Sequence, residues 1–220
     1  MLGWLLWGCL SSAPRCPDGM VAIAAGPAKL GVEQPRSWQE PQRTTALGAY
    51  CIDTYEFPNV EGGVPQANAT WEDARDACAA AGKRLCTADE WERACRGPEG
   101  RQYAYGPARD ASTCNTPIEG GGPGKDGLPP TRSGAWAGCK TPEGVYDLNG
   151  SLSEWVSDPW DGDPEPFNLE ARVDPATWRT LRGGTMWSRT FYGQDCTSRH
   201  GHHTSFHNVD DGFRCCKDAG

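Results

Sequence analysis

The sequence predicts an irregular α+β domain with little regular secondary structure and many disulfides, and three observations lead to this fold class. Only two short segments have the periodicity and capping residues of helices. The 220 residues include 28 Gly and 18 Pro, which favour turns and loops. Eleven cysteines are spread from Cys9 to Cys216. We expect one domain, because nothing in the chain repeats and its length allows a sizeable core.

The first part of the chain has the pattern of strands joined by turns. Residues 16–31 alternate short apolar runs with Gly and Pro, which predicts a strand and a turn. Residues 34–46 are polar, contain two prolines and are expected to form an exposed loop. The run Ala49–Tyr55 then predicts a further strand.

Two helices are predicted from their N-terminal caps. Each begins at a threonine that is followed three positions later by an acid, Thr70 with Asp73 and Thr87 with Glu90. Apolar residues then follow at helical spacing, and a glycine ends each segment. The tryptophan in each helix is expected to pack in the core. Beyond residue 97 no helical period is sustained, so short strands and glycine-rich loops are expected there.

Composition excludes one class of partner and indicates a compartment. The net charge of -8 opposes binding to a phosphate backbone, so no nucleic-acid partner is expected. No CxxC pair occurs, which argues against zinc-ribbon and iron–sulfur sites. Scattered cysteines are typical of disulfides, and disulfides persist in oxidising compartments. The protein is therefore expected to be exported, to the periplasm or the extracellular space.

The N-terminal residues 1–15 are expected to be an export segment that precedes a domain over residues 16–220. A short apolar run from Leu2 to Trp7 ends at Cys9, as in the signal of a bacterial lipoprotein. Three interpretations stay open, namely lipid attachment at Cys9, a cleaved ordinary signal peptide and a packed N-terminal segment. Lipidation of Cys9 would leave an even number of cysteines for disulfides. It would also be the only attachment to a membrane.

Six segments of the chain, taken together and in order, resemble the formylglycine-generating enzyme family, also called the sulfatase-modifying factor family. The resemblance covers about residues 16 to 216 and implies the family's irregular mixed fold, which is related to C-type lectins. The matching segments are DGMVAI (18–23), TWEDARDAC (70–78), GKRLCTADEWERACRG (82–97), GVYDLNGSLSEWVSD (144–158), RGG (182–184) and GFRC (212–215).

The resemblance also implies where the catalytic residues of an active member would lie. That family holds copper by two cysteine thiolates, which suit Cu(I), and oxidises a sulfatase cysteine to formylglycine. The matching positions here are Ser188 and Gly193, and the segment contains no cysteine before Cys196. Bound copper is therefore not expected.

A set of disulfides follows from the same resemblance. The family bonds the cysteine of the second helix to Cys196 and the cysteine of the first helix to the one in the GFRC segment. The remaining pairs rest on proximity in the family's layout. The implied pairs are Cys78–Cys215, Cys95–Cys196, Cys16–Cys51, Cys86–Cys216 and Cys114–Cys139.

Two calcium sites are implied as well, and hard oxygen ligands around a glycine turn suit this ion. Without the resemblance, the same Asp-Asn-Gly clusters are typical of ordinary turns. The second site would order the glycine-rich loop of residues 119–130. The implied ligands are the side chains of Asp147 and Glu154 with the carbonyls of Gly150 and Leu152, and the side chains of Asn115 and Asp126 with the carbonyls of Thr116 and Leu128.

Four histidines close together near the C-terminus suggest another metal. They are His200, His202, His203 and His207. His203 and His207 form the better pair for one ion if that stretch is helical, and this metal would be a transition metal. Histidine is also common as an ordinary surface or core residue, so both interpretations stay open.

Three functions therefore compete. The first is a calcium-stabilised domain that has lost the oxidase and recognises a protein segment, a peptide or a glycan. The second is an oxidoreductase that uses another metal on a protein or small thiol substrate. The third, an active formylglycine-generating enzyme, conflicts with the missing thiolates, because the thiolate is itself the metal ligand.

Overall fold

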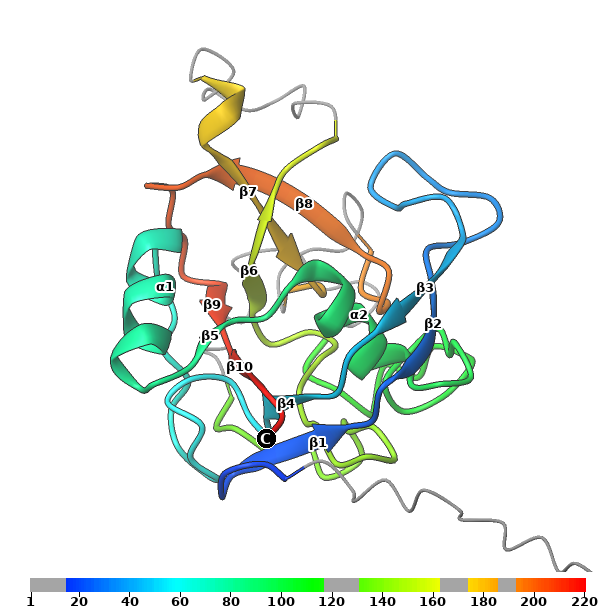
Figure 1. Cartoon of the computed structure of the whole chain (residues 1–220), viewed down its shortest axis with the longest axis horizontal. Coiled ribbons are helices and arrows are strands. Elements are labelled where there is room, and N and C mark those ends of the chain that lie inside the picture. Colours follow the sequence, from blue (N-terminus) through cyan, green and yellow to red (C-terminus); the bar gives the residue numbers. More distant parts are fainter. Residues whose placement is uncertain (1–14, 117–130, 163–173, 186–192) are drawn as a thin grey trace, which may run out of the picture.

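Two four-stranded sheets and a two-stranded ribbon form the framework of the protein (Figure 1). The computed structural model describes residues 15–116, 131–162, 174–185 and 193–220. In this part of the chain, two α-helices and ten mostly short strands alternate with long loops. The predicted irregular α+β fold is confirmed.

The first sheet joins both ends of the described chain. Its strand order is β1-β4-β10-β5, and every pairing is antiparallel. Strand β4 (Tyr50–Asp53) lies within the run predicted from residues 49–55, and all its residues are buried. The strands are β1 (Met20–Ile23), β4 (Tyr50–Asp53), β5 (Arg84–Leu85) and β10 (Cys215–Asp218).

The second sheet has the order β8-β7-β6-β9. Strands β6 and β9 are parallel, with Ser153 opposite Asp211, whereas the other pairings are antiparallel. A 3-10 turn, Pro175–Thr177, precedes β7. The strands are β6 (Ser153–Pro159), β7 (Trp178–Arg182), β8 (Arg199–His203) and β9 (Asp211–Phe213).

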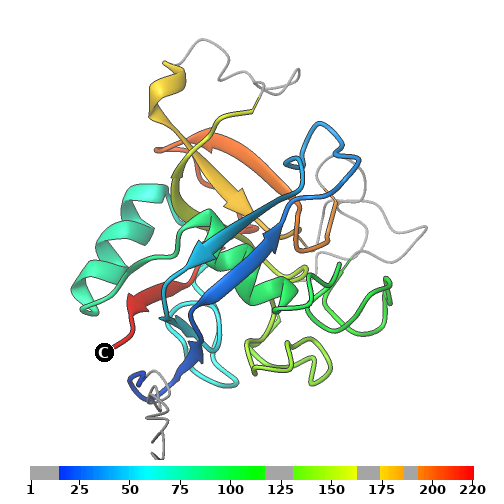
Figure 2. The ribbon, with the colours of Figure 1, turned by 45° about the vertical axis from the view of Figure 1, so that its right-hand side comes forward.

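The ribbon pairs β2 (Gly26–Leu30) with β3 (Arg43–Leu47) and runs from the first sheet toward the second, where the Trp38 carbonyl accepts from the Arg199 amide of β8 at 3.2 Å (Figure 2). Here the sequence prediction was partly wrong, because β3 occupies the end of the expected loop of residues 34–46. The polar side chains explain the difference. Alternate residues of β3 are exposed, as is usual in a strand with one solvated face, so the segment lacks an apolar run.

Both predicted helices are present with the predicted caps. Helix α1 (Trp71–Ala80) begins with a reciprocal capping box between Thr70 and Asp73, and α2 (Ala88–Arg96) begins with the same motif between Thr87 and Glu90. Helix α1 flanks the molecule, whereas α2 lies near its centre and is almost wholly buried (Figure 1). Trp91 is a core residue, but Trp71 is only partly buried and donates its indole N–H to the Val156 carbonyl at 2.8 Å.

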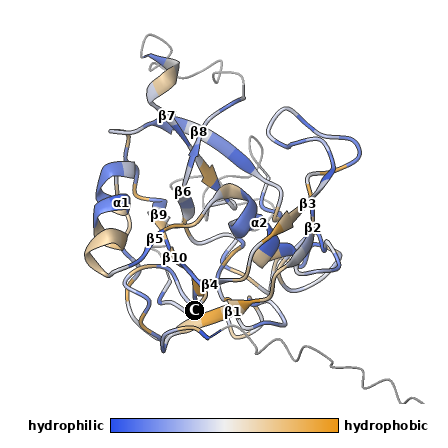
Figure 3. Cartoon of the chain, in the orientation of Figure 1, coloured by the Kyte–Doolittle hydropathy of each residue, from blue (hydrophilic) through white to orange (hydrophobic). Residues whose placement is uncertain are grey.

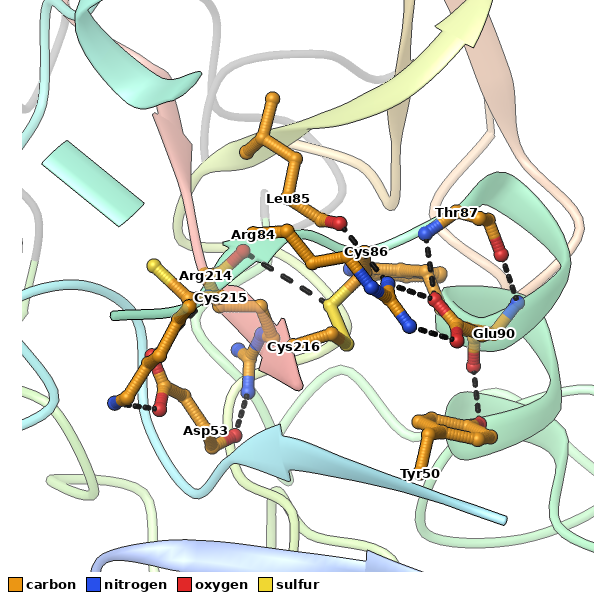
Figure 4. Close-up of a disulfide and its surroundings, with 12 residues drawn as sticks. Tyr50, Asp53, Arg84, Leu85, Cys86, Thr87, Glu90, Arg214, Cys215 and Cys216 are labelled. Atoms are coloured by element: carbon orange, nitrogen blue, oxygen red, sulfur yellow. Dashed lines mark hydrogen bonds and ion pairs between the residues drawn. A yellow bond between two sulfur atoms is a disulfide. The ribbon is translucent and has the colours of Figure 1, made fainter. Parts of the chain in front are cut away.

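The core consists of two clusters of buried side chains, and their apolar strands are visible in the hydropathy colouring (Figure 3). One centres on Trp91 and α2, the other on Trp155 and α1. Adjacent cysteines on β10 belong to different clusters (Figure 4): Cys216 bonds to Cys86 and Cys215 to Cys78. These bonds tie each cluster to the same strand.

Five disulfides are formed, and they are the five pairs implied by the family resemblance. Their number indicates an oxidising environment outside the cytosol. No helix in the described ranges is long and apolar enough to cross a membrane. The bonded pairs are Cys16–Cys51, Cys78–Cys215, Cys86–Cys216, Cys95–Cys196 and Cys114–Cys139.

Candidate functional site

A group of buried charges lies between the two sheets, and we call it the carboxylate cluster. It comprises Glu56, Asp147, Glu154 and Arg214, and each side chain is at least 95% buried. Glu56 follows β4, Asp147 stands in the loop before β6, Glu154 is on β6, and Arg214 separates β9 from β10. Three segments that are distant in sequence thus contribute the four charges, because Asp147 and Glu154 lie only seven residues apart.

Glu154 and Arg214 form the centre of the cluster. Arg214 Nε donates to Glu154 Oε2 at 2.7 Å, and Arg214 Nη2 donates to Oε1 at 2.7 Å. The indole N–H of Trp91 donates to Oε2 at 2.6 Å. Arg214 also donates to the Tyr146 carbonyl at 2.8 Å. Such a bidentate, charge-assisted pair is strong and geometrically specific, so it fixes the position of both side chains.

The other two carboxylates are less well satisfied. Neither oxygen of Glu56 has a partner at hydrogen-bond distance and geometry, although the Leu152 amide is near enough to act on its charge. Burial raises the pKa of Glu56 well above its usual range, and the charges of Asp147 and Glu154 raise it further. Burial also raises the pKa of Asp147 to about 6, against the hydrogen bond from the Gly134 amide at 2.7 Å.

The cluster therefore has the electrostatic character of a cation site. Its three carboxylates and one guanidinium leave a net charge of -2 when all are ionised, and an uncompensated buried charge is costly. The resemblance adds the carbonyls of Gly150 and Leu152 to the ligands. In the described ranges, however, no three His, Cys, Asp or Glu side chains converge as a ready metal cage. Glu154 would have to share its oxygens between an ion and Arg214.

The turn beside the cluster depends on glycine. Gly150 has a φ of 77°, and a Cβ there would lie 2.2 Å from the Asn115 carbonyl oxygen. The amide of Ser151 donates to the same oxygen at 2.9 Å. Gly150 thus brings the two implied calcium loops into contact. Asn115 and Thr116 are described and buried or partly buried, whereas Asp126 and Leu128 lie outside the described residues.

The position of the family's catalytic cysteines is described only in part. Ser188 lies outside the described residues, and Gly193 has a φ of 68°. A Cβ at Gly193 would come within 2.6 Å of the Ser198 hydroxyl and 3.1 Å of the Trp38 indole nitrogen. A side chain there would be strained and crowded. The nearby Cys196 is bonded to Cys95.

The histidines lie on or just after β8 and face different neighbours. The stretch from His203 to His207 is not helical, because His203 ends a strand and a turn follows, so the condition for pairing these two histidines on one ion is not met. Nδ1 of His203 is 2.8 Å from the Ser205 hydroxyl, and Nδ1 of His207 is 3.0 Å from Asn68 Oδ1.

The other two histidines form an aromatic contact on the strand itself. The rings of His200 and His202 meet edge to face at 5.2 Å, and Phe206 stacks on His202 at 3.9 Å. Burial lowers the pKa of His200 well below its usual value and that of His202 to about 4, so both are neutral at pH 7.

Sequence reasoning missed Glu56 and Arg214 as members of the cluster. Glu56 directly follows the strand predicted from residues 49–55, and a carboxylate at the end of a buried strand was a usable signal. Arg214 belongs to the GFRC segment, where only the cysteine was considered. The sequence shows which residues carry a charge. Only the folded structure shows that these charges are buried beside one another, because they come from distant segments.

Comparison with known proteins agrees with this architecture. The family model of the sulfatase-modifying factor enzyme 1-like domain matches residues 59–219. The formylglycine-generating enzyme of Thermomonospora curvata is 30% identical over 82% of this chain and 86% of its own length. The inactive C-alpha-formylglycine-generating enzyme 2 of Bos taurus is 28% identical over 83% of this chain, which spans only 56% of that relative.

Solved structures show the same fold at low sequence identity. Treponema denticola variable protein 1 superimposes with a TM-score of 0.68 at 17% identity, over 90% of this chain and 94% of the other. PvdO from Pseudomonas aeruginosa gives 0.69 at 16% identity, with the same coverage of both chains. On the family match, the chain belongs to the formylglycine-generating enzyme (sulfatase-modifying factor) family.

Proposed function

We propose that this protein is an exported, calcium-stabilised binding domain that lacks the copper-dependent oxidase of its family. The fold and family are common to catalytic and non-catalytic proteins, so fold alone does not decide the function. The proposal rests on the chemistry of the available side chains.

The state of the cysteines carries the first part of the proposal. A Cu(I) site of the family type needs two thiolates. Of the eleven cysteines, ten are joined in disulfides, which leaves Cys9 alone. One thiol cannot form the pair, and the backbone at Gly193 disfavours any side chain. A relative named as inactive, the bovine protein above, is consistent with such a loss.

The carboxylate cluster supports the calcium part. Glu56 is 1% exposed and both its oxygens lack a hydrogen bond, which is unusual for a buried carboxylate. A divalent ion between Glu56, Asp147 and the carbonyl oxygens of the Gly150 turn would neutralise the excess charge. Calcium is the ion that such flexible, all-oxygen ligand sets prefer.

The alternative oxidoreductase has less support. It needs a transition metal at the histidines, but His203 and His207 are each engaged by a different neighbour. Export is favoured by the five disulfides, and attachment through a lipidated Cys9 remains part of the proposal.

An oxidase assay tests this function. The purified protein is incubated with copper, oxygen and a peptide that carries a sulfatase-type cysteine motif, and the peptide is analysed by mass spectrometry. The Thermomonospora curvata enzyme, assayed in parallel, serves as the positive control. We expect aldehyde only in the control. Turnover by this chain at a comparable rate would contradict the proposal.

A further inference from the structure

Strand β1 is an outer strand of the first sheet, and one of its edges faces away from the sheet. Its neighbour in the sheet is β4, and Figure 1 shows β1 near the lower rim of the molecule. The Thr54 amide donates to the Gly19 carbonyl at 3.1 Å, which continues the register of β1 with β4. Successive residues of an antiparallel strand turn their backbone groups to opposite sides. Val21 therefore bonds to β4, whereas Met20 and Ala22 direct their N–H and C=O groups away from it.

The outward backbone groups of β1 are available to another strand. The Met20 amide donates to the Pro17 carbonyl at 3.1 Å and so closes the turn before the strand. Among the described residues, no backbone partner outside the sheet reaches Ala22, and Ala22 is exposed. A strand edge with unpaired N–H and C=O groups is a template for pairing with a further strand.

This edge also lacks the features that usually protect one. Exposed edges are normally blunted by charged side chains, proline or a β-bulge. The eight residues from Gly19 to Gly26 contain no charge and no proline, although the chain as a whole has a net charge of -8. Strand β1 is coloured as hydrophobic in Figure 3, and its four pairs with β4 follow one another without a bulge. An unprotected edge of this kind is expected to be covered by a partner.

The other edges of the two sheets are protected. Strand β5, at the opposite edge of the first sheet, has only two residues, and one of them is the charged Arg84. At β9 the Phe57 amide donates to the Phe213 carbonyl at 2.9 Å. At β8 the Trp38 carbonyl accepts from the Arg199 amide, and the first three residues of the strand are buried. Within the described ranges, β1 therefore has the one sheet edge that is neither short, charged nor covered.

From this contrast we propose that β1 pairs in antiparallel orientation with β1 of a second copy of this chain, about a two-fold axis at Ala22. Such an interface is self-complementary, because each Ala22 donates its N–H to the other and accepts from it. Antiparallel pairing also brings the end that carries the exposed Asp18 toward the end that carries the exposed Lys29 of the second copy. Opposite charges at the ends favour this orientation over the parallel one.

The strand is already held in the geometry that pairing needs. Cys16 precedes β1 and is bonded to Cys51, which stands opposite Ala22 in the ladder with β4. Little ordering is therefore left for the moment of association. The contact is small, because β1 has only four residues. We expect a weak dimer that forms as the concentration rises.

Sedimentation velocity on the full chain tests the proposal. Concentrations from about 1 μM to about 1 mM cover the dissociation constants of weak complexes. The chain should change from monomer to dimer over this range, at a constant calcium concentration. The Ala22 amide should exchange its hydrogen more slowly in the dimer, because it becomes hydrogen-bonded. Non-reducing electrophoresis verifies that Cys9 has not linked the two copies covalently.

Substitutions of Ala22 and one matched control locate the interface. Ala22→Pro removes the outward N–H but no bond to β4. Ala22→Lys places two like charges opposite each other across the axis. Each should raise the dissociation constant at least about tenfold. An equimolar mixture of Ala22→Lys and Ala22→Glu should dimerise again. Ala46→Lys, at an exposed alanine of β3, is the control and should leave the dimer unchanged. Near-UV circular dichroism verifies that each variant is folded.

Each possible result decides for or against the pairing. A monomer at every concentration would overturn it and leave the edge of β1 to a strand of another protein. A dimer that persists in folded Ala22→Lys, or that is lost equally in Ala46→Lys, would place the interface elsewhere. A mixture of Ala22→Lys and Ala22→Glu that stays monomeric would refute the pairing of Ala22 with itself. None of these results depends on the oxidase assay or on the calcium site, so the inference is tested separately from the proposed function.

Discussion

Arg214 holds both oxygens of Glu154 at 2.7 Å, although Glu154 is one of the calcium ligands predicted from the family resemblance. The pair explains which charges of the carboxylate cluster remain uncompensated. Glu154 is neutralised by Arg214, so the excess negative charge belongs mainly to Glu56 and Asp147. A calcium ion is therefore expected to depend most on Glu56, whose carboxylate oxygens make no hydrogen bond.

The first prediction concerns Glu56→Gln. In excess chelator this variant should melt at a higher temperature than the parent, because removing an unsatisfied buried charge recovers about 1–3 kcal/mol. The parent should lose stability on chelation: an ion at about 100 times its Kd contributes about 2.7 kcal/mol. This equals a shift in melting temperature of about 5–10 °C for a domain of this size. The variant should lose most of that response.

Glu61→Gln is the matched control for this experiment. Glu61 is exposed and lies in the loop that follows Glu56. The Glu61→Gln variant should therefore have the same melting temperature as the parent, both with and without chelator. Differential scanning fluorimetry in calcium and in chelator provides all the comparisons. If calcium does not change the melting temperature of the parent, the calcium site is contradicted. If chelation lowers the melting temperature of Glu56→Gln as much as that of the parent, Glu56 is not a ligand of the ion.

The second prediction concerns Arg214→Met. The substitution leaves Glu154 buried with only Trp91 as a partner, and such uncompensated charges cost about 3–5 kcal/mol. The double variant Glu154→Leu with Arg214→Met should recover much of this loss, because it removes both charges of the ion pair and leaves the net charge of the cluster unchanged. Urea unfolding followed by tryptophan fluorescence measures both. A single variant within about 1 kcal/mol of the parent would show that the pair is not a structural centre.

Sequence predicted local structure well because its signals are local. Each capping box spans only four residues, and the boxes that begin at Thr70 and Thr87 predicted the start of both helices. The ribbon strand β3 was missed because its exposed face removes the apolar run on which prediction depends. The carboxylate cluster was found only in part, since it draws its four charges from three segments that are distant in sequence. The environment that raises the pKa of Glu56 exists only after folding.

The third prediction is acid sensitivity through the histidines of β8. Burial lowers the pKa of His202 to about 4, whereas in the unfolded chain it is about 6.5. The unfolded state therefore binds more protons between these values, and the free energy of unfolding falls as pH drops through this window. From pH 7 to pH 5 the loss from His202 is about 2 kcal/mol.

His202→Gln should make this dependence less steep by the contribution of His202, because glutamine does not titrate, whereas the buried His200 keeps its own contribution. His207→Gln is its control, since His207 is exposed on the turn after β8. Thermal melts over pH 5 to 7 measure both variants in the presence of the same calcium concentration. An equally steep pH profile in His202→Gln and in the parent would assign the acid sensitivity to other groups.

The last prediction compares the disulfide Cys86–Cys216, which ends on β10, with the disulfide Cys114–Cys139. The Cys86–Cys216 bond closes a sequence separation of 130 residues, whereas Cys114–Cys139 closes one of 25. When Cys86–Cys216 is removed, however, Cys78–Cys215 still closes nearly the same loop, so the part of the chain that is released is only about ten residues long. If the bonds act by constraining the unfolded chain, removal of Cys86–Cys216 therefore costs about 2.7 kcal/mol and removal of Cys114–Cys139 about 3.5 kcal/mol. The longer bond also anchors one core cluster to the strand that carries the other through Cys215. From loop closure alone, we expect the double variant Cys114→Ala with Cys139→Ala to be less stable than Cys86→Ala with Cys216→Ala. Denaturant unfolding without reductant compares them, and non-reducing peptide mapping verifies that the other four bonds persist in each. If the Cys86 and Cys216 variant proves the less stable, loop closure does not govern these bonds, and the anchoring of the two core clusters through β10 must account for the difference.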